Sequence, residues 1–271
     1  MKRYRQTRIL AILEERPAVS VADLSAALGA SVGTIRRDLA ALQLSGQLRR
    51  VHGGAFAAVQ GEGGFTWRTC LNMDKKSAVG RAAAAEIMPG SVVFIDGGTT
   101  TEAMLPYLAG KTSLTVVTCA LNIAVSLLRI PYINTILLGG SVHAESRTVI
   151  GPLPVKQMDA FGLRFDAAII STAGISAEHG ATNRMLERLP LKQKVLESCE
   201  QSFLISDSSK LDRVYLGRVA PLLSFTRCYI DDNLSNEQKR SLSAAGNFTF
   251  VPVPAQKEGE KRISGLKSAD I

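Results

Sequence analysis

The chain has 271 residues, of which 46% are hydrophobic and 21% charged, so it can form two unequal domains and has the composition of a soluble globular protein. No apolar run reaches the roughly 18 residues that a membrane-spanning helix needs, and no long apolar stretch follows the basic N-terminus as it would in a signal peptide. We therefore expect a cytoplasmic protein with no membrane partner.

The net charge of +8 is concentrated near the N-terminus. Residues 1–60 hold nine of the 32 basic residues but only four of the 24 acidic ones. A basic N-terminal segment before a remainder whose charges nearly balance suggests that this segment, called the head below, binds a polyanion. A solvent-exposed basic surface with no partner would show the same excess of positive charge. The four cysteines and three histidines lack metal-ligand spacing, so we expect reduced cysteines, no metal and no cofactor.

Three helices are predicted before residue 45. In the first, Ile9, Ile12 and Leu13 recur at helical spacing. Ser20 can cap the second helix, which ends before Gly29. Because glycine adopts left-handed conformations readily, Gly29 permits the tight turn of a helix-turn-helix.

The third predicted helix, from residue 31 to about residue 42, has the features of a DNA-recognition helix. Ser31 can cap it, and its apolar stripe leaves Thr34, Arg36 and Arg37 off the core face. Hydroxyl and guanidinium groups on such a face suit the major groove, where arginine pairs with guanine or holds a phosphate. Asp38 would repel phosphate, so we expect it to orient an arginine or to face the domain body.

A short basic strand and a glycine turn follow at residues 48–55, and they predict a β-wing whose basic side chains contact phosphates. The alternative to a DNA-binding domain is a small helical subdomain whose surface carries basic residues without binding DNA. The predicted DNA-binding residues are Ser20, Ser31, Thr34, Arg36, Arg37, Arg49, Arg50 and His52.

This head resembles the DeoR family of bacterial sugar-metabolism transcriptional regulators. The resemblance rests on Arg5, Ile9 and Leu13, on the segment 31–39 with its Thr-Ile-Arg-Arg-Asp run, and on the wing at 50–55. It implies that residues 1–57 form a winged helix-turn-helix that binds double-stranded operator DNA. The glycine-rich stretch that follows predicts a linker over residues 58–74.

Beyond the linker, apolar strands alternate with helices. Strands are predicted at residues 91–95, 114–118, 133–138, 167–172, 202–206, 228–231 and 248–251. Helices are predicted at residues 101–108, 121–128, 155–161, 191–200 and 236–245. This alternation predicts an α/β domain with a Rossmann-like, largely parallel sheet over residues 75–255. We expect residues 256–271 to form a flexible tail.

Polar and glycine residues follow five of these strands, where parallel α/β sheets bind ligands. The loop 96–101 combines glycines, threonine hydroxyls and the start of a helix, which suits a phosphate or another anion. The chain has neither a Walker A motif nor a dinucleotide-binding fingerprint. The predicted ligand-binding residues are Asp96, Gly97, Gly98, Thr99, Thr100, Thr101, Thr118, Asn122, Gly139, Gly140, Gly174, Asp207, Ser208 and Lys210.

The DeoR resemblance extends over this domain, through the segments 96–100, 114–118, 138–140 and 207–210. It implies a sensor domain that shares its fold with ribose-5-phosphate isomerase. That domain would bind a phosphorylated sugar and assemble a dimer or tetramer. The whole protein would be a repressor of a carbohydrate-utilisation operon, and the bound sugar would release it from DNA. The chain departs from the family pattern at Cys119, at residues 171–174 and at Pro190, which we expect to interrupt a helix.

Two alternatives stay open for the larger domain. It could be an active phosphosugar isomerase-like enzyme with a DNA-binding appendage, for which Asp96 and Asp207 are the available general bases. It could also serve only to hold an oligomer together. A strand-end aspartate more often holds a turn or a ligand hydroxyl, so we expect a regulator rather than an enzyme, with no catalytic residue.

Overall fold

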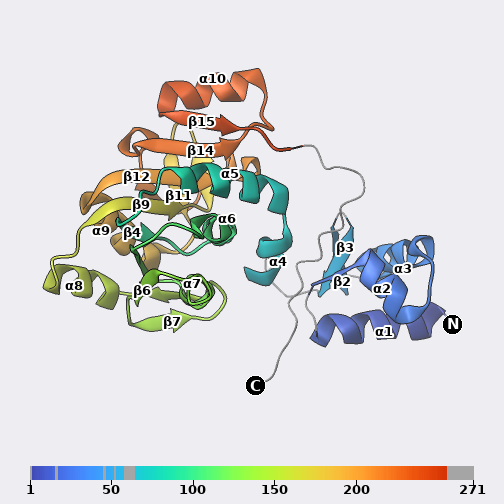
Figure 1. Ribbon diagram of the computed structural model, residues 1–271. Helices are drawn as coiled ribbons and strands as arrows, with labels where there is room; N and C mark the ends of the chain where they lie inside the picture. Colours follow the sequence, from blue (N-terminus) through green and yellow to red (C-terminus); the bar gives the residue numbers. More distant parts are fainter. Residues whose placement is uncertain (1, 16–17, 45–46, 52, 58–64, 255–271) are drawn as a thin grey trace.

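The computed structural model describes residues 2–15, 18–44, 47–51, 53–57 and 65–254 (Figure 1). His52 and the predicted tail 256–271 lie outside these residues. The predicted linker, 58–74, is described from residue 65 on, and that part contains a helix, α4 (Phe65–Cys70), followed by the start of α5 (Met73–Ala85). The limits of the predicted domains stay a prediction.

Three helices and three short strands form the N-terminal domain. The helices are α1 (Lys2–Glu15), α2 (Val21–Leu28) and α3 (Val32–Leu44), and the strands are β1 (Ala18–Ser20), β2 (Leu48–Val51) and β3 (Gly54–Ala57). Gly29 ends α2 with φ of 58°, the left-handed conformation that the turn requires. β2 and β3 pair as an antiparallel hairpin, which confirms the predicted wing. β1 pairs with β3 on its other side and makes this a three-stranded sheet, which was not predicted.

The predicted apolar stripes of this domain meet in one core. Ile9, Leu24, Ile35 and Leu39 are fully buried there, one from α1, one from α2 and two from α3. Val32, which falls on the same side of the predicted third helix, is 41% exposed. It is the first residue of α3.

The larger domain is built on a seven-stranded sheet in which every pair of neighbouring strands is parallel. Its strands are β4 (Val92–Ile95), β5 (Leu114–Thr118), β6 (Ile133–Leu137), β9 (Phe165–Ser171), β12 (Cys199–Ser206), β14 (Arg227–Asp231) and β15 (Phe248–Val251). The order across the sheet is β15-β14-β12-β9-β4-β5-β6. The chain leaves β4 toward β5 and β6 and then returns to β9 on the other side. The strand order therefore reverses between β4 and β9, the place where open α/β sheets bind ligands.

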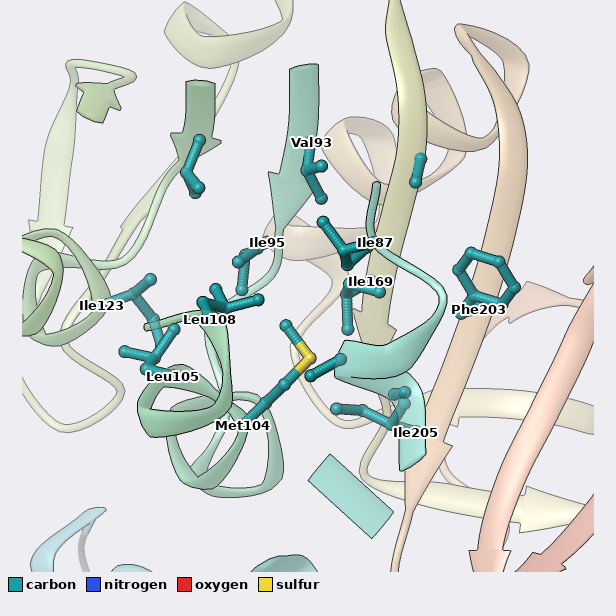
Figure 2. Packing of buried hydrophobic residues seen from close by; sticks show 14 of the residues in the cluster. Ile87, Val93, Ile95, Met104, Leu105, Leu108, Ile123, Ile169, Phe203 and Ile205 are labelled. Atoms are coloured by element: carbon teal, nitrogen blue, oxygen red, sulfur yellow. The ribbon is translucent and has the colours of Figure 1, made fainter. Parts of the chain in front are cut away.

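Helices cover both faces of this sheet, so successive side chains of a strand are buried on opposite sides. On one face Val93 and Ile95 pack with Met104, Ile123 and Ile169 (Figure 2). That face is covered by α5, by α6 (Thr99–Met104) with a 3-10 turn (Leu105–Leu108), and by α7 (Leu121–Leu127). The other is covered by α8 (Leu153–Ala160), α9 (Leu189–Glu197) and α10 (Asn236–Ala245). Burial on both faces explains why these strands are continuously apolar.

Two smaller strand groups were not predicted. One is the hairpin of β7 (Ser141–His143) and β8 (Thr148–Ile150), and the other the antiparallel set of β10 (Gly174–Ser176), β11 (Gly180–Asn183) and β13 (Gly217–Ala220). Their strands have three or four residues and little apolar alternation. The expectation that Pro190 interrupts a helix was wrong. Pro190 lies in the first turn of α9, where a missing N–H costs nothing, so it starts the helix.

Candidate DNA-binding surface and ligand pocket

Serine side chains cap both helices of the helix-turn-helix. Ser20 Oγ accepts a hydrogen bond from Asp23 N at 3.0 Å and donates to the Asp23 carboxylate at 2.7 Å. Ser31 Oγ accepts from Thr34 N at 3.3 Å and lies 2.9 Å from Thr34 Oγ1. The two serines predicted to contact DNA therefore hold helix ends in this structure. Their contact with DNA stays a prediction.

Arg36 and Arg37 project from the exposed side of α3. Arg37 is held against its own helix, because its Nε donates to Gly33 O at 3.3 Å and its Nη2 lies 3.5 Å from Thr34 Oγ1. Arg50 is exposed on the wing strand β2, whereas the side chain of Arg49 lies outside the described part of the chain. The exposed arginines of α3 and of the β2–β3 hairpin are thus available to bind a polyanion.

Asp38, the one acidic residue of α3, is turned away from this surface. Its side chain is buried, and Arg5 Nε of α1 donates a hydrogen bond to its Oδ2. This confirms the expectation that Asp38 faces the domain body and orients an arginine. The ion pair ties α1 to α3 and removes a negative charge that would repel phosphate.

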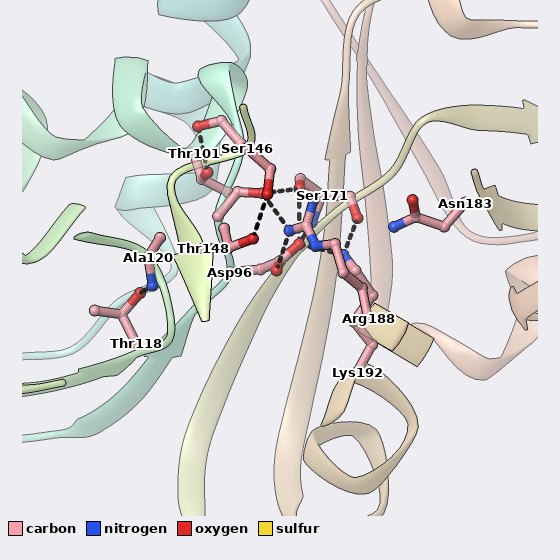
Figure 3. Close-up of polar contacts among 12 residues, drawn as sticks. Asp96, Thr101, Thr118, Ala120, Ser146, Thr148, Ser171, Asn183, Arg188 and Lys192 are labelled. Atoms are coloured by element: carbon pink, nitrogen blue, oxygen red, sulfur yellow. Dashed lines mark hydrogen bonds and ion pairs between the residues drawn. The ribbon is translucent and has the colours of Figure 1, made fainter. Parts of the chain in front are cut away.

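Asp96 ends β4 at the switch point and lies in a buried polar cluster (Figure 3). Ser171, at the end of β9, donates to its Oδ2 from the backbone N at 3.0 Å and from Oγ at 2.7 Å. Arg188 Nη2 donates to Asp96 Oδ1 at 3.1 Å and to Gly97 O at 2.7 Å. Lys192 Nζ donates to Asp96 Oδ2, and to Ser171 O at 2.7 Å. Both carboxylate oxygens are therefore already engaged.

The charges of this cluster determine the state of the carboxylate. Burial alone would raise the pKa of Asp96, but the charges of Lys192 and Arg188, with hydrogen bonds from Lys192 and Ser171, hold it below its ordinary value. Asp96 is thus ionised at neutral pH. Burial lowers the pKa of Lys192, and the charge of Asp96 opposes that shift. Arg188, which pairs with Asp96, also lines the neighbouring pocket.

A pocket of about 440 Å³ lies beside the cluster. This volume falls in the range of small-molecule sites. Its wall carries five cationic side chains, but among the described residues only one carboxylate, that of the exposed Glu145. The five are Arg68, Arg184, Arg188, Lys210 and Arg213. Such an excess of positive charge suits an anionic ligand.

Two of these cations are constrained by their surroundings. Burial lowers the pKa of Lys210, Asp207 opposes that shift, and Arg213 and Arg68 add to it. Arg184 lies over the ring of Tyr215, with its Cζ 4.4 Å from the ring centroid, and its Nη2 donates to the Tyr215 hydroxyl at 2.6 Å. Tyr215 thus holds the Arg184 side chain in place at the pocket wall.

Five predicted ligand-binding residues form part of the pocket wall: Gly97, Gly98, Thr99, Thr100 and Lys210. The two glycines are needed for packing, because a Cβ on Gly97 would lie 2.3 Å from Thr148 Cγ2 and one on Gly98 would lie 2.6 Å from Ser171 Oγ. The helix that follows, α6, has only six residues, so the cationic side chains provide more of the attraction for an anion than the helix end does. Contact of these residues with a ligand stays a prediction.

Nine other predicted ligand-binding residues are not part of that wall: Asp96, Thr101, Thr118, Asn122, Gly139, Gly140, Gly174, Asp207 and Ser208. Thr101 and Thr118 are buried and use their hydroxyls to bond the carbonyls of Gly98 and Ile95, at 2.8 and 2.6 Å. Gly139 N bonds the side chain of Gln157 on α8, at 2.9 Å. The expectation that ligands bind at the carboxyl ends of parallel strands identified the correct edge of the sheet. It does not show which residues of that edge face the pocket.

Asp207 and Ser208 belong to a second network, which joins the start of α5 to the ends of β12 and β14. Asn72 Nδ2 donates to Asp207 Oδ1 at 3.2 Å, and Lys75 Nζ donates to Ser208 Oγ at 2.7 Å. Ser208 N donates to Asp231 Oδ2 at 2.6 Å. These groups fix the helix to the sheet rather than line the pocket.

Most of the cationic wall was not predicted. Arg184 and Arg188 lie in the polar segment between β11 and α9, and Arg213 lies in the loop before β13. The sequence signal that could have identified them is the spacing of Arg184 and Arg188, four residues apart in a segment without apolar periodicity. Arg68 comes from the predicted linker, and nothing in the sequence places it near the sheet.

The structure describes the side chains of three of the four cysteines. Cys119, Cys199 and Cys228 are free thiols, and burial raises the pKa of Cys119 to about 11 and that of Cys228 to about 12. Among the described residues no group of three His, Cys, Asp or Glu side chains is placed to hold a metal ion. No helix in the same residues is long and apolar enough to cross a membrane.

A winged helix-turn-helix with exposed arginines, joined to a parallel α/β domain with a cationic pocket, defines a class of DNA-binding regulator. Residues 5–60 match the DeoR-like helix-turn-helix domain, and residues 71–232 match the DeoR C terminal sensor domain. The chain belongs to the DeoR family of transcriptional regulators.

Similar proteins from other organisms match this chain over most of their length and most of its own. The chain is 32% identical over 240 residues to the HTH-type transcriptional regulator YgbI of Escherichia coli K12, covering 88% of this chain and 93% of that one. It is 30% identical over 245 residues to the glycerol-3-phosphate regulon repressor of Haemophilus influenzae, covering 88% and 95%. These relatives are transcriptional regulators. Among solved structures, ribose 5-phosphate isomerase A of Neisseria gonorrhoeae aligns over 52% of this chain and 54% of its own, with 14% identity and a TM-score of 0.38.

Proposed function

We propose that this regulator represses a carbohydrate-utilisation operon and is released from its operator by a phosphorylated sugar or sugar derivative bound in the pocket. The pocket wall carries this proposal, because five cationic side chains face a cavity of about 440 Å³ with one carboxylate among the described lining residues. A phosphate ester supplies the charge that such a wall lacks.

The wall also offers groups for the sugar part of the ligand. Thr99, Thr100, Thr172 and Asn183 line the pocket beside the cations. Hydroxyl and amide side chains donate and accept hydrogen bonds, as do sugar hydroxyls. We therefore expect the phosphate to lie among the arginines and Lys210, with the hydroxyls toward the threonines and Asn183.

Release of the operator follows from differential binding of the ligand. A hundredfold loss of operator affinity needs about 2.7 kcal/mol of difference in ligand binding between the two arrangements of the protein. One phosphate with two charge-assisted hydrogen bonds can supply this amount, since each contributes about 1.5–3 kcal/mol.

The test begins with genomic DNA fragments selected by the purified full chain, which provide the operator. Fluorescence anisotropy then measures operator affinity during titration with glucose 6-phosphate, fructose 1-phosphate, ribose 5-phosphate and glycerol 3-phosphate, with the unphosphorylated compounds as matched controls. We expect at least one ester, and none of the controls, to weaken binding about a hundredfold. Binding of an ester by calorimetry without any change in operator affinity would refute the proposed release.

The isomerase alternative has less support. Catalysis needs a carboxylate free to take a proton from the substrate. Of the two sequence candidates, Asp96 is engaged on both oxygens by Lys192, Arg188 and Ser171. Asp207 is not part of the pocket wall, and its Oδ1 accepts hydrogen bonds from Asn72 and Ser209. Conversion of a phosphosugar by the purified protein would restore the alternative.

We further propose that the protein acts as a homo-oligomer, a dimer or a tetramer. β6 is an edge strand of the sheet, yet Ile136 and Leu137 on it are exposed, as are Leu128 and Tyr132 just before it. A second copy that covers these side chains would also supply the second recognition helix that repeated half-sites require. Sedimentation of the wild-type chain beside Ile136→Glu tests this, with a shift of the variant toward monomer expected.

A further inference from the structure

Arg68 differs from the other cations of the pocket in where it comes from. It lies on α4, between the segments that match the two family domains, which end at residue 60 and begin at residue 71. Figure 1 shows α4 between the winged helix and the parallel sheet. The side chain of Arg68 nevertheless lines the pocket with Arg184, Arg188 and Lys210.

The guanidinium of Arg68 is surrounded by like charges. Burial lowers its pKa, and Arg188 and Arg184 lower it further. The described residues give it no carboxylate partner. Because arginine does not give up its proton in proteins, the repulsion persists until an anion arrives.

α4 contacts both domains, because it packs against α6 of the larger domain and against β1 of the N-terminal domain. Arg68 Cζ lies 5.6 Å from the centroid of the Phe65 ring, and Arg147 Cζ lies 5.1 Å from the same centroid. The buried Lys76 donates a hydrogen bond from Nζ to the carbonyl of Arg68 near the end of the helix. A change in the charge around Arg68 therefore acts on a helix that contacts both domains.

We propose that Arg68 is the contact through which a ligand in the pocket controls α4, and through α4 the winged helix. This inference rests on the proposed function. An anionic ligand pairs with Arg68 and holds α4 against the pocket. Without the ligand, Arg184 and Arg188 repel Arg68, and α4 is free to take the arrangement in which the head binds DNA.

The chain carries its own reporter for this movement. Trp67, its single tryptophan, is the neighbour of Arg68 in α4, so fluorescence excited selectively in tryptophan rather than tyrosine reports on that helix. Arg68→Gln removes the charge of the linking contact. Arg213→Gln is the matched control, because it removes a charge from the same pocket but from the loop before β13.

The experiment measures three quantities on the full chain: ligand affinity by calorimetry, Trp67 emission, and operator affinity. The probes are inorganic phosphate and the four esters used above. For the wild type we expect binding with a change in Trp67 emission and loss of operator affinity. Both variants should bind ligand roughly 10- to 100-fold more weakly, as for loss of a charge-assisted hydrogen bond. At saturation Arg213→Gln should keep the emission change and the operator release, and Arg68→Gln should lose both.

The outcomes separate this inference from the proposed function. If saturated Arg68→Gln still shows the emission change and releases the operator, Arg68 is not the linking contact, although the pocket remains the ligand site. If both variants lose the emission change and the release at saturation, the coupling is not specific to Arg68 and the inference is also wrong. If no probe binds the wild type, the proposed function fails and this inference fails with it.

Discussion

Replacing Lys192 with methionine tests whether Asp96 serves the structure of the site rather than the ligand. Methionine keeps most of the side-chain volume but removes the charge. Asp96 and Lys192 are 1% and 2% exposed, and the variant leaves the carboxylate buried with Arg188 and Ser171 as its remaining partners. Removing one partner of a buried ion pair costs about 3–5 kcal/mol, and the retained Arg188 contact places this case near the lower value.

A loss of about 3 kcal/mol lowers the melting temperature of a domain of this size by roughly 6–12 °C. Differential scanning calorimetry of the full chain measures the shift in the transition of the larger domain. Lys194→Met is the matched control, because Lys194 lies on the same helix and pairs with Asp159 at the exposed surface. We expect the control to shift that transition little.

The double variant Asp96→Asn/Lys192→Met should be more stable than Lys192→Met, because it removes the uncompensated charge. The pH dependence has a defined sign. The pKa of Asp96 is lowered in the folded wild type, so its contribution is present above the ordinary value of about 3.9 and is lost as pH falls through the folded value. In Lys192→Met the pKa of Asp96 rises, and protonation relieves the buried charge, so the difference in stability from wild type should narrow as the pH falls from neutral. A shift no larger than that of Lys194→Met would refute the reasoning.

Three further predictions concern the two domains separately. Arg36→Ala and Arg37→Ala should each weaken operator binding. An arginine that contacts phosphate should, when lost, reduce by about 1 the slope of log affinity against log salt concentration. An arginine that contacts a base should, when lost, cost about 1–3 kcal/mol of binding free energy and relax the sequence preference. Anisotropy at several salt concentrations measures both, and unchanged binding in both variants contradicts the recognition helix. Ser31→Ala should destabilise the N-terminal domain by about 1 kcal/mol, measured by denaturation followed by circular dichroism. Lys210→Met should weaken phosphate-ester binding roughly tenfold or more in calorimetry without lowering the melting temperature.

The sequence predicted the sheet well for a physical reason. The central strands of the sheet are buried on both faces, so β4 and β9 are rich in apolar residues. The predicted limits of β5 and β15 are those found in the structure. α5 was missed because its buried face is made largely of small residues such as Ala78 and Ala83, which give little contrast in hydropathy. The winged helix was predicted in detail because capping serines, a turn glycine and apolar stripes are all local signals.

The pocket was predicted only in part, because its wall depends on contacts between distant segments. The loop from Gly97 to Thr100 follows a buried strand, and the expectation that ligands bind at strand ends places it correctly. Arg68 and Arg188 come from α4 and from the segment before α9, and no periodic pattern relates them to that loop. Asp96 illustrates the same limit, since its partner Lys192 lies 96 residues further along the chain.

The buried cluster and the open pocket depend on each other. Asp96 fixes Arg188, and Arg188 in turn bonds the carbonyl of Gly97 on the pocket loop. The loop and one arginine of the wall are therefore positioned by a charge that no ligand replaces. A ligand then need not order them, so more of its binding energy is available to act on Arg68, which the described residues leave without an acidic partner. Arg188 is thus fixed by the sheet and Arg68 is attached to α4, beside the DNA-binding domain, which is the arrangement that the proposed coupling requires.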